Sequence, residues 1–257
     1  MEEIFQFLAD NYKKGANSNG TGSQIHQMIK ERTGCEDPYK NEKKLANEIA
    51  LSFMDQVKEI LNEDNSLEAY VKIAIVGNII DFGALTLDGD IEGLISSGLK
   101  KDLTINHVDK LEKALKNHKK LLYLVDNTGE IVFDKLLLEK LKEYDVDITI
   151  AVKEKPILND ACIEDGISVG LDKYGKLTTI GTDTVGLVYD KASPEFRELF
   201  DNSDFIISKG LGNYEGLTEL DLSNKDVFFC LCSKCSATSK NIGVNIQDIV
   251  LFKADSE

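Results

Sequence analysis

Two loops of this sequence carry oxygen-bearing side chains shortly after an apolar run. Asp126 and Asn127 follow the apolar residues 121–125, and Asp160 lies a few positions after residues 147–152, which are rich in β-branched side chains. Carboxylate and amide oxygens are hard ligands of the kind that Mg²⁺ and Mn²⁺ prefer in proteins. If the two loops meet in space, these residue types predict one divalent-metal site.

A third loop, after an expected strand at residues 204–208, carries the residue types that bind phosphate. Glycine lets backbone N–H groups approach an anion closely, and lysine serves as a point charge for phosphate. We therefore expect Lys209, Gly210 and Asn213 to bind a phosphorylated substrate, with Lys155 of the second loop as a further cation. The spacing is neither that of a Walker motif nor that of a dinucleotide-binding fingerprint.

Each loop alone has a simpler interpretation. Asp126 or Asn127 could cap the helix that follows, Asp160 could cap the next one, and the glycines could form an ordinary turn. Ligands of open parallel sheets, however, bind at the carboxyl ends of the strands, where such loops converge. Three polar loops at one edge of a sheet therefore favour an enzyme site over independent caps.

The apolar pattern predicts the elements that would position these loops. We expect strands at residues 121–125, 147–152, 177–180, 204–208, 227–232 and 249–252, with helices at 131–144 and 194–200. Short continuous apolar runs are typical of strands covered on both faces. Strands alternating with helices imply an α/β fold with a Rossmann-like, mainly parallel sheet flanked by helices.

The first 120 residues lack this alternation, and their apolar spacing is helical. Asp37 and Pro38 signal the start of one long amphipathic helix that extends to residue 62, and further helices are expected at 67–78 and 108–115. The sequence thus predicts a helical subdomain at residues 1–120 that contributes one wall of the cleft. Residues 121–257 are expected to form the Rossmann-like domain with the metal and phosphate loops.

Charge and composition exclude several classes of protein. The 257 residues are 42% hydrophobic, so a folded chain is expected, and 45 acidic against 30 basic residues give a net charge of -15. That excess repels polyanions and makes nucleic-acid binding unlikely, although lysines or a metal ion can still attract a small phosphorylated ligand. No apolar run approaches the roughly 20 residues of a membrane helix, and the five cysteines favour reduced thiols in a cytoplasmic protein.

Five segments resemble, in the same order, motifs of the damage-control phosphatases, the DUF89 group. They are residues 76–83, 126–130, 155–160, 208–215 and 234–235. The match looks closest to the compact archaeal and bacterial subfamily and extends from about residue 25 to residue 252. The subfamily pattern begins with a Cys-x-x-Cys segment, and this chain starts without one.

The resemblance implies a metal-dependent phosphatase that hydrolyses phosphate monoesters of small metabolites, such as sugar phosphates or cofactor precursors. The implied cofactor is a divalent metal: Mn, Mg, Co or Ni. By resemblance, the metal-binding positions are Asp126, Asn127 and Asp160, and Lys209 and Asn213 match the phosphate loop.

The resemblance also adds three residues to the predicted site. Asn78 and Asp81 match a polar segment of the helical part that faces the same cleft, and Glu130 stands beside the metal position in the catalytic set. Whether water or Asp126 attacks phosphorus stays open.

Two other functions remain compatible with the sequence. One is a carboxyl methyltransferase on the same Rossmann-like fold, since one fold supports many chemistries. The loop at 126–129, however, lacks the glycine-rich turn that a methyl donor usually needs. The other is a non-catalytic protein that binds a phosphorylated metabolite.

Overall fold

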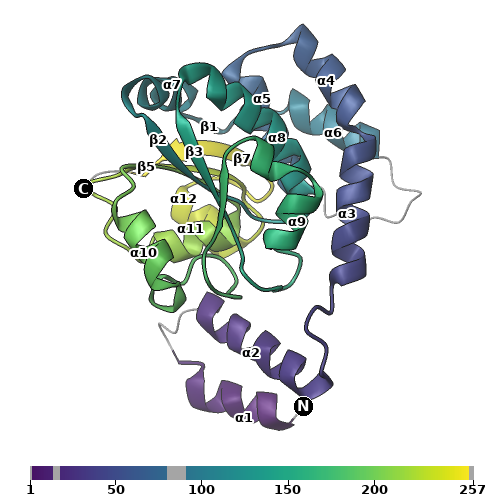
Figure 1. The fold of residues 1–257 in the computed structure, drawn as a ribbon, viewed down its shortest axis with the longest axis vertical. Helices are drawn as coiled ribbons and strands as arrows, with labels where there is room; N and C mark the ends of the chain where they lie inside the picture. The colour runs from purple at the N-terminus through teal and green to yellow at the C-terminus, as the bar shows by residue number, and fades with distance from the viewer. Residues whose placement is uncertain (1, 14–17, 80–90, 255–257) are drawn as a thin grey trace.

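The computed structural model describes residues 2–13, 18–79 and 91–254, which form a seven-stranded sheet (Figure 1). Its strand order is β1-β7-β6-β5-β2-β3-β4. The strands are β1 Ile105–Asn106, β2 Lys120–Leu124, β3 Asp147–Val152, β4 Lys176–Thr179, β5 Phe205–Lys209, β6 Asp226–Cys232 and β7 Ile249–Lys253. In this described sheet β7 runs antiparallel to β6, whereas the other neighbours pair in parallel. The expected mainly parallel α/β fold is confirmed.

Helices cover both faces of the sheet. In chain order they are α1 Glu2–Asn11, α2 Ser18–Thr33, α3 Lys40–Ser52, α4 Met54–Glu63, α5 Leu67–Ile79, α6 Ile91–Lys100, α7 Val108–Asn117, α8 Glu130–Leu141, α9 Ile163–Ser168, α10 Pro194–Asp201, α11 Leu211–Leu217 and α12 Ser236–Ile242. Along β2, Leu121 and Tyr123 pack with α5, α7 and α8, while Leu122 and Leu124 pack with α10 and α11. The apolar run forms a strand because both of its faces are covered.

One core joins the N-terminal helices to the sheet. Helix α5 lies directly against α8, and a Cβ added to Gly77 of α5 would come 2.9 Å from Phe133 Cδ2 of α8. Leu115 of α7 and Leu121 of β2 belong to the same apolar cluster, so this core runs across Lys120. The division into two domains at that residue stays a prediction from the sequence pattern.

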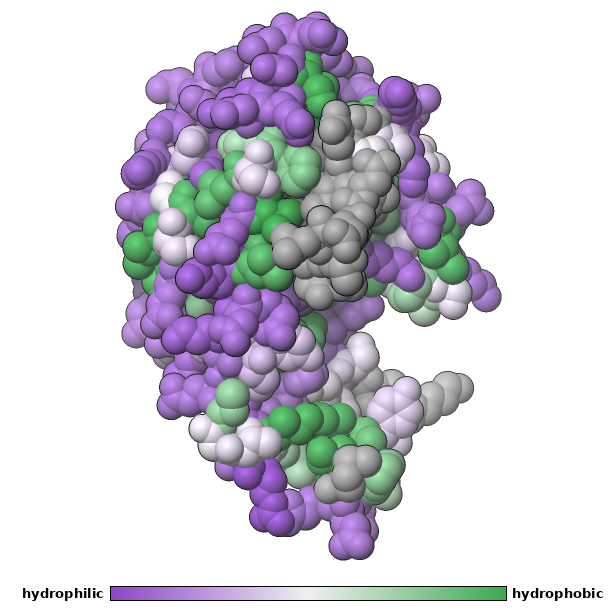
Figure 2. All heavy atoms as spheres, turned by 90° about the vertical axis from the view of Figure 1, so that its right-hand side faces the viewer, coloured by the Kyte–Doolittle hydropathy of each residue, from purple (hydrophilic) through white to green (hydrophobic). Residues whose placement is uncertain are grey.

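Helices α1 and α2 form a lobe apart from this core, below the sheet in Figure 1. Figure 2 shows the lobe set off from the main body by an open hollow on one face. Helix α2 contacts loops at the carboxyl edge of the sheet: Asn19 Nδ2 donates to Gly212 O at 2.9 Å, and Lys30 Nζ pairs with Asp183 at 2.8 Å. Among the described helices, not one combines the length and apolar character that a membrane span requires.

The predicted helix at residues 38–62 is wrong in two respects. It is broken at Phe53 into α3 and α4, and it begins at Lys40 rather than Pro38. The N-cap position belongs to Tyr39, whose side chain makes no capping hydrogen bond. Asp37 lies two residues earlier, where one carboxylate oxygen accepts from Tyr39 N at 3.1 Å and the other pairs with the buried Lys43 at 3.1 Å.

Candidate active site

The three predicted loops meet where the order of the sheet reverses. From β2 the chain proceeds through β3 and β4 on one side, and then returns to β5 and β6 on the other. Open α/β sheets bind their ligands at such a switch point, beyond the carboxyl ends of the strands. Asp126 follows β2 and Lys209 ends β5 at this place, and the loop after β3 carries Asp160.

Backbone contacts join the loop after β2 to the loop after β3. Asn127 and Asp160 form an antiparallel bridge, Ala161 N donates to Asp126 O at 2.8 Å, and Thr128 N donates to Asn159 O at 2.9 Å. These contacts place Asp160 beside Asp126 and Asn127, although it lies more than thirty positions after them along the chain. The structure thus brings together the three residues predicted to bind metal.

The two carboxylates of this cluster are buried. Asp126 is 9% exposed and Asp160 is 4% exposed, and Asn127 Nδ2 donates to Asp126 Oδ2 at 2.7 Å. Asp160 Oδ2 lies 3.6 Å from Lys153 Nζ and has no hydrogen-bond partner among the described residues. A buried charge is costly unless it is paired or binds a cation.

Burial also shifts the acidity of these groups. It raises the pKa of Asp126 well above the usual value, and the nearby Glu130 and Asp160 carboxylates add to the rise. It raises the pKa of Asp160 to about 6, against the opposing charge of Lys153. Burial and the neighbouring carboxylates therefore disfavour the charged forms of Asp126 and Asp160, and a bound cation would favour them.

The donor chemistry of this cluster suits a hard divalent ion, with two carboxylates and one amide. Within residues 2–13, 18–79 and 91–254, no three His, Cys, Asp or Glu side chains gather as a metal site. The predicted set has two such members, Asp126 and Asp160, because its third member, Asn127, is an amide. The buried oxygen of Asp160 that accepts no hydrogen bond among the described residues is the observation that fits a cation here.

Gly210 is required by the position of Asp126. A Cβ at residue 210 would lie 2.0 Å from Asp126 Oδ2, and Gly210 has a φ of +80°, which disfavours other residues. Its N–H donates to Cys230 O at 3.2 Å. The glycine thus makes room for a carboxylate of the site, whereas the sequence had predicted a contact with phosphate.

The structure gives Lys209 a role other than the predicted phosphate contact. Its side chain is fully buried, and Nζ donates to Glu130 Oε1, to Asp134 Oδ1 at 2.7 Å and to Ala74 O at 3.0 Å. An ammonium has three N–H donors, so all are used. Burial lowers the pKa of Lys209, but Asp134 and Glu130 outweigh it and raise the pKa above its usual value.

Glu130 connects this buried lysine to the metal-binding loop. One carboxylate oxygen pairs with Lys209, and the other accepts from Asn127 N at 3.4 Å. Glu130 is the first residue of α8 and is fully buried. The sequence placed it in the catalytic set; the structure places it beneath the loop, where it supports Asn127.

The other predicted substrate residues lie in different surroundings. Asn213 is fully buried, and its Nδ2 donates to Val125 O and Lys209 O, both at 2.9 Å, so it joins the ends of β2 and β5 in place of a phosphate contact. Lys155 is exposed. Asn78 belongs to α5, but its side chain lies outside the described residues, as does the whole of Asp81.

The main site residue absent from the sequence prediction is Lys153. It is 2% exposed, donates a hydrogen bond to Gly186 O and faces Asp160, and burial lowers its pKa. The sequence argument chose Lys155 from the same loop. The position of Lys153 could have identified it, because it directly follows the last residue of β3 and is therefore held in place at the edge of the sheet.

Known proteins resemble this chain over nearly its whole length. Residues 1–250 match the damage-control phosphatase ARMT1-like domain. The chain belongs to the damage-control phosphatase family. A damage-control phosphatase of Archaeoglobus fulgidus is 33% identical over 97% of this chain and 87% of its own length. An uncharacterized protein of Methanocaldococcus jannaschii is 42% identical over 98% of this chain and 85% of its own.

The family also has a solved structure with the same fold. The crystal structure of a DUF89 family protein from Pyrococcus horikoshii matches this chain with a TM-score of 0.89 and 35% sequence identity. The match covers 99% of this chain and 88% of the Pyrococcus horikoshii chain. A damage-control phosphatase of that organism is 38% identical over 93% of this chain and 82% of its own length. The predicted family, fold class and phosphatase class are confirmed, and the family suggests the use of a divalent metal.

Proposed function

We propose that this chain hydrolyses phosphate monoesters of small metabolites with a divalent ion held by Asp126, Asn127 and Asp160. The observation that supports the proposal most is the backbone bridge between Asn127 and Asp160, which makes one cluster of oxygen donors from two loops. The buried Asp160 oxygen without a hydrogen-bond partner among the described residues adds to it. Family membership supports the reaction class.

A bound divalent ion would supply positive charge that attracts a phosphate oxygen and offsets charge in the transition state. Asp126, Asn127 and Asp160 would hold that ion in a fixed place. Asp126 is needed as a ligand, so we favour water as the attacking group. The oxygen of water would bond to phosphorus, the ester P–O bond would break, and one proton of the water would pass to the leaving oxygen, so that the products are an alcohol and inorganic phosphate.

Lys153 is proposed to bind the substrate phosphate through its ammonium group. Its ammonium is the buried positive charge beside Asp160, and it has one hydrogen bond, to Gly186 O, among the described residues. Two N–H donors thus remain for Asp160 and for a phosphate oxygen. Lys155, Asn78 and Asp81 stay proposed substrate contacts.

Release of phosphate from p-nitrophenyl phosphate, with Mn²⁺, Mg²⁺, Co²⁺ or Ni²⁺ added, tests the proposal. We expect activity that a chelator removes and added metal restores. Asp126→Asn and Asp160→Asn should abolish it, and the matched exposed variant Asp172→Asn should not. Wild-type turnover by Asp160→Asn would contradict the assigned site.

A panel of sugar phosphates and phosphorylated cofactor precursors would then define the substrate class. Phosphate release from none of them with any metal would favour the non-catalytic alternative. Methyl transfer to a carboxylate without metal would favour the methyltransferase.

A further inference from the structure

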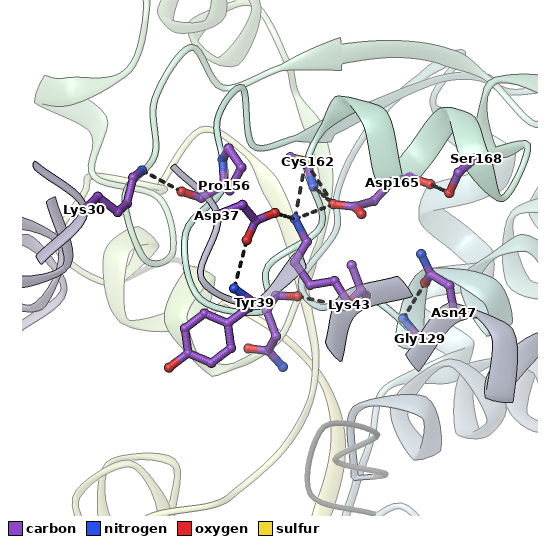
Figure 3. A network of polar contacts seen from close by, with 12 residues as sticks. Lys30, Asp37, Tyr39, Lys43, Asn47, Gly129, Pro156, Cys162, Asp165 and Ser168 are labelled. Atoms are coloured by element: carbon purple, nitrogen blue, oxygen red, sulfur yellow. Dashed lines mark hydrogen bonds and ion pairs between the residues drawn. The ribbon is translucent and has the colours of Figure 1, made fainter. Parts of the chain in front are cut away.

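Two buried polar residues of α3 contact the loops of the metal cluster, one residue for each loop. Lys43 and Asn47 are four positions apart and therefore lie on the same face of the helix. They are 2% and 6% exposed, although each is polar. Figure 3 shows both side chains directed from α3 toward the loops that follow β2 and β3.

Asn47 holds the loop that carries Asp126 and Asn127. Its Oδ1 accepts a hydrogen bond from Gly129 N at 2.7 Å. Gly129 has a φ of +77° and precedes α8, so its N–H has no carbonyl of that helix to bind. Asn47 thus fixes the turn two residues after Asn127.

Lys43 holds the loop that carries Asp160. Its Nζ lies 2.8 Å from Asp165 Oδ2 and 3.5 Å from Cys162 Sγ. The same Asp165 oxygen accepts from Cys162 N at 2.9 Å, which closes the first turn of α9. Lys43 therefore fixes the chain two residues after Asp160.

A second lysine holds the same loop on the other side of Asp160. Lys30 of α2 donates to Pro156 O at 2.9 Å (Figure 3). The loop is thus held four residues before Asp160 and two residues after it by cations from the N-terminal helices. None of these contacts uses a side-chain oxygen of Asp126 or Asp160, so both carboxylates stay directed into the cluster.

We propose that Lys43 and Asn47 are positioning residues that hold the two ligand loops at the separation a divalent ion requires. The inference rests on the proposed metal site. Partners outside the ligand shell orient the ligands, and their loss typically weakens metal affinity by about 10- to 100-fold. The N-terminal helices would then determine metal affinity without contacting the metal.

The test is the dissociation constant for Mn²⁺, measured by isothermal titration calorimetry on the full chain. Asn47→Ala and Lys43→Met should raise it roughly 10- to 100-fold. Lys43→Arg keeps a cation near Asp165 and should stay within a few-fold of wild type. With saturating Mn²⁺, kcat for p-nitrophenyl phosphate should recover in both weakened variants, because the ligands themselves remain.

Two control variants separate positioning from general loss of stability. Lys44→Met alters the next residue of α3, whose side chain is 76% exposed. Lys140→Met alters another buried lysine, which pairs with Glu143 away from the loops. Both should bind Mn²⁺ as wild type does, while Lys140→Met lowers the melting temperature.

Wild-type Mn²⁺ affinity in Asn47→Ala would overturn the inference even if Lys43→Met failed to fold. Equal weakening by Lys140→Met would overturn it as well. If instead the wild-type chain bound no Mn²⁺, or Asp160→Asn bound it normally, the proposed metal site itself would be refuted. The two failures are therefore distinguishable.

Discussion

Replacement of Lys209 by methionine removes the one cation of a fully buried ionic cluster. Glu130 and Asp134 both pair with Lys209, and all three side chains are 0% exposed. Methionine fills a similar volume but leaves two carboxylates without their counter-ion. The carbonyl of Ala74 also loses its contact with Nζ.

The expected loss of stability is large for a single substitution. Breaking a buried ion pair by removing one partner costs about 3–5 kcal/mol, because the remaining charge stays buried. Here two carboxylates remain, and the pKa of Asp134 is already raised to about 6 by burial despite Lys209. We therefore expect Lys209→Met to lower the free energy of unfolding by about 4 kcal/mol at pH 7.

Urea unfolding in the presence of a chelator measures this loss without a metal contribution. Lys225→Met is the matched control, because Lys225 Nζ donates to the carbonyls of Phe200, Asp201 and Ser203 and leaves no carboxylate behind. It should cost about 1 kcal/mol. Adding Asp134→Asn to Lys209→Met should recover part of the loss, because one buried charge is then removed.

A loss for Lys209→Met no larger than that of the control would refute the ionic-cluster account. So would a variant of normal stability whose only defect is a raised KM for phosphate esters. That second result would restore the phosphate contact predicted from the sequence.

Three further predictions concern the same region. Gly210→Ala should weaken Mn²⁺ binding roughly tenfold or more, since its Cβ would displace the Asp126 carboxylate; unchanged calorimetric affinity would contradict this. Tyr123→Phe should lower the unfolding free energy by about 1 kcal/mol, because Tyr123 donates to Asp134 at 2.8 Å; a stabilised variant in urea would count against it. Burial raises the pKa of Asp134 to about 6, so the contribution of this group to the free energy of unfolding falls as pH rises from about 4 to about 6. Asp134→Asn should therefore flatten the pH dependence of the unfolding free energy in that range. A steeper dependence would contradict this.

The strand ends were predictable because parallel strands expose their loops at one edge. The apolar runs before Asp126 and before Lys209 became β2 and β5, adjacent in the sheet, as their alternation with helices indicated. That Asp160 would meet Asn127 required the reversal of strand order, which no local pattern contains. The sequence therefore identified the loops but not their register.

The direction of each lysine could not be read from its own loop. The side chain of Lys209 points into the core because it pairs there with Glu130 and Asp134, which lie four positions apart on the buried helix α8. Two acids four positions apart, on either side of the apolar residues 131–133, were the available signal. Lys153 and Lys155 differ only by two positions, yet one is buried and the other exposed.

The positioning role of α3 was hidden for a similar reason. Asn47 lies among the apolar residues Ala46, Ile49 and Ala50, where a polar side chain must find a partner. That partner is Gly129 N, eighty-two positions away. Contacts of this range depend on the tertiary packing of α3 against α8.

A crystal structure of the Mn²⁺-soaked protein, with anomalous differences collected for manganese, tests the central claim most directly. The account predicts one strong peak within reach of side-chain oxygens of Asp126, Asn127 and Asp160, and its loss in Asp160→Asn crystals soaked in the same way. A peak elsewhere, or none at this cluster in an enzyme that Mn²⁺ activates, would contradict it.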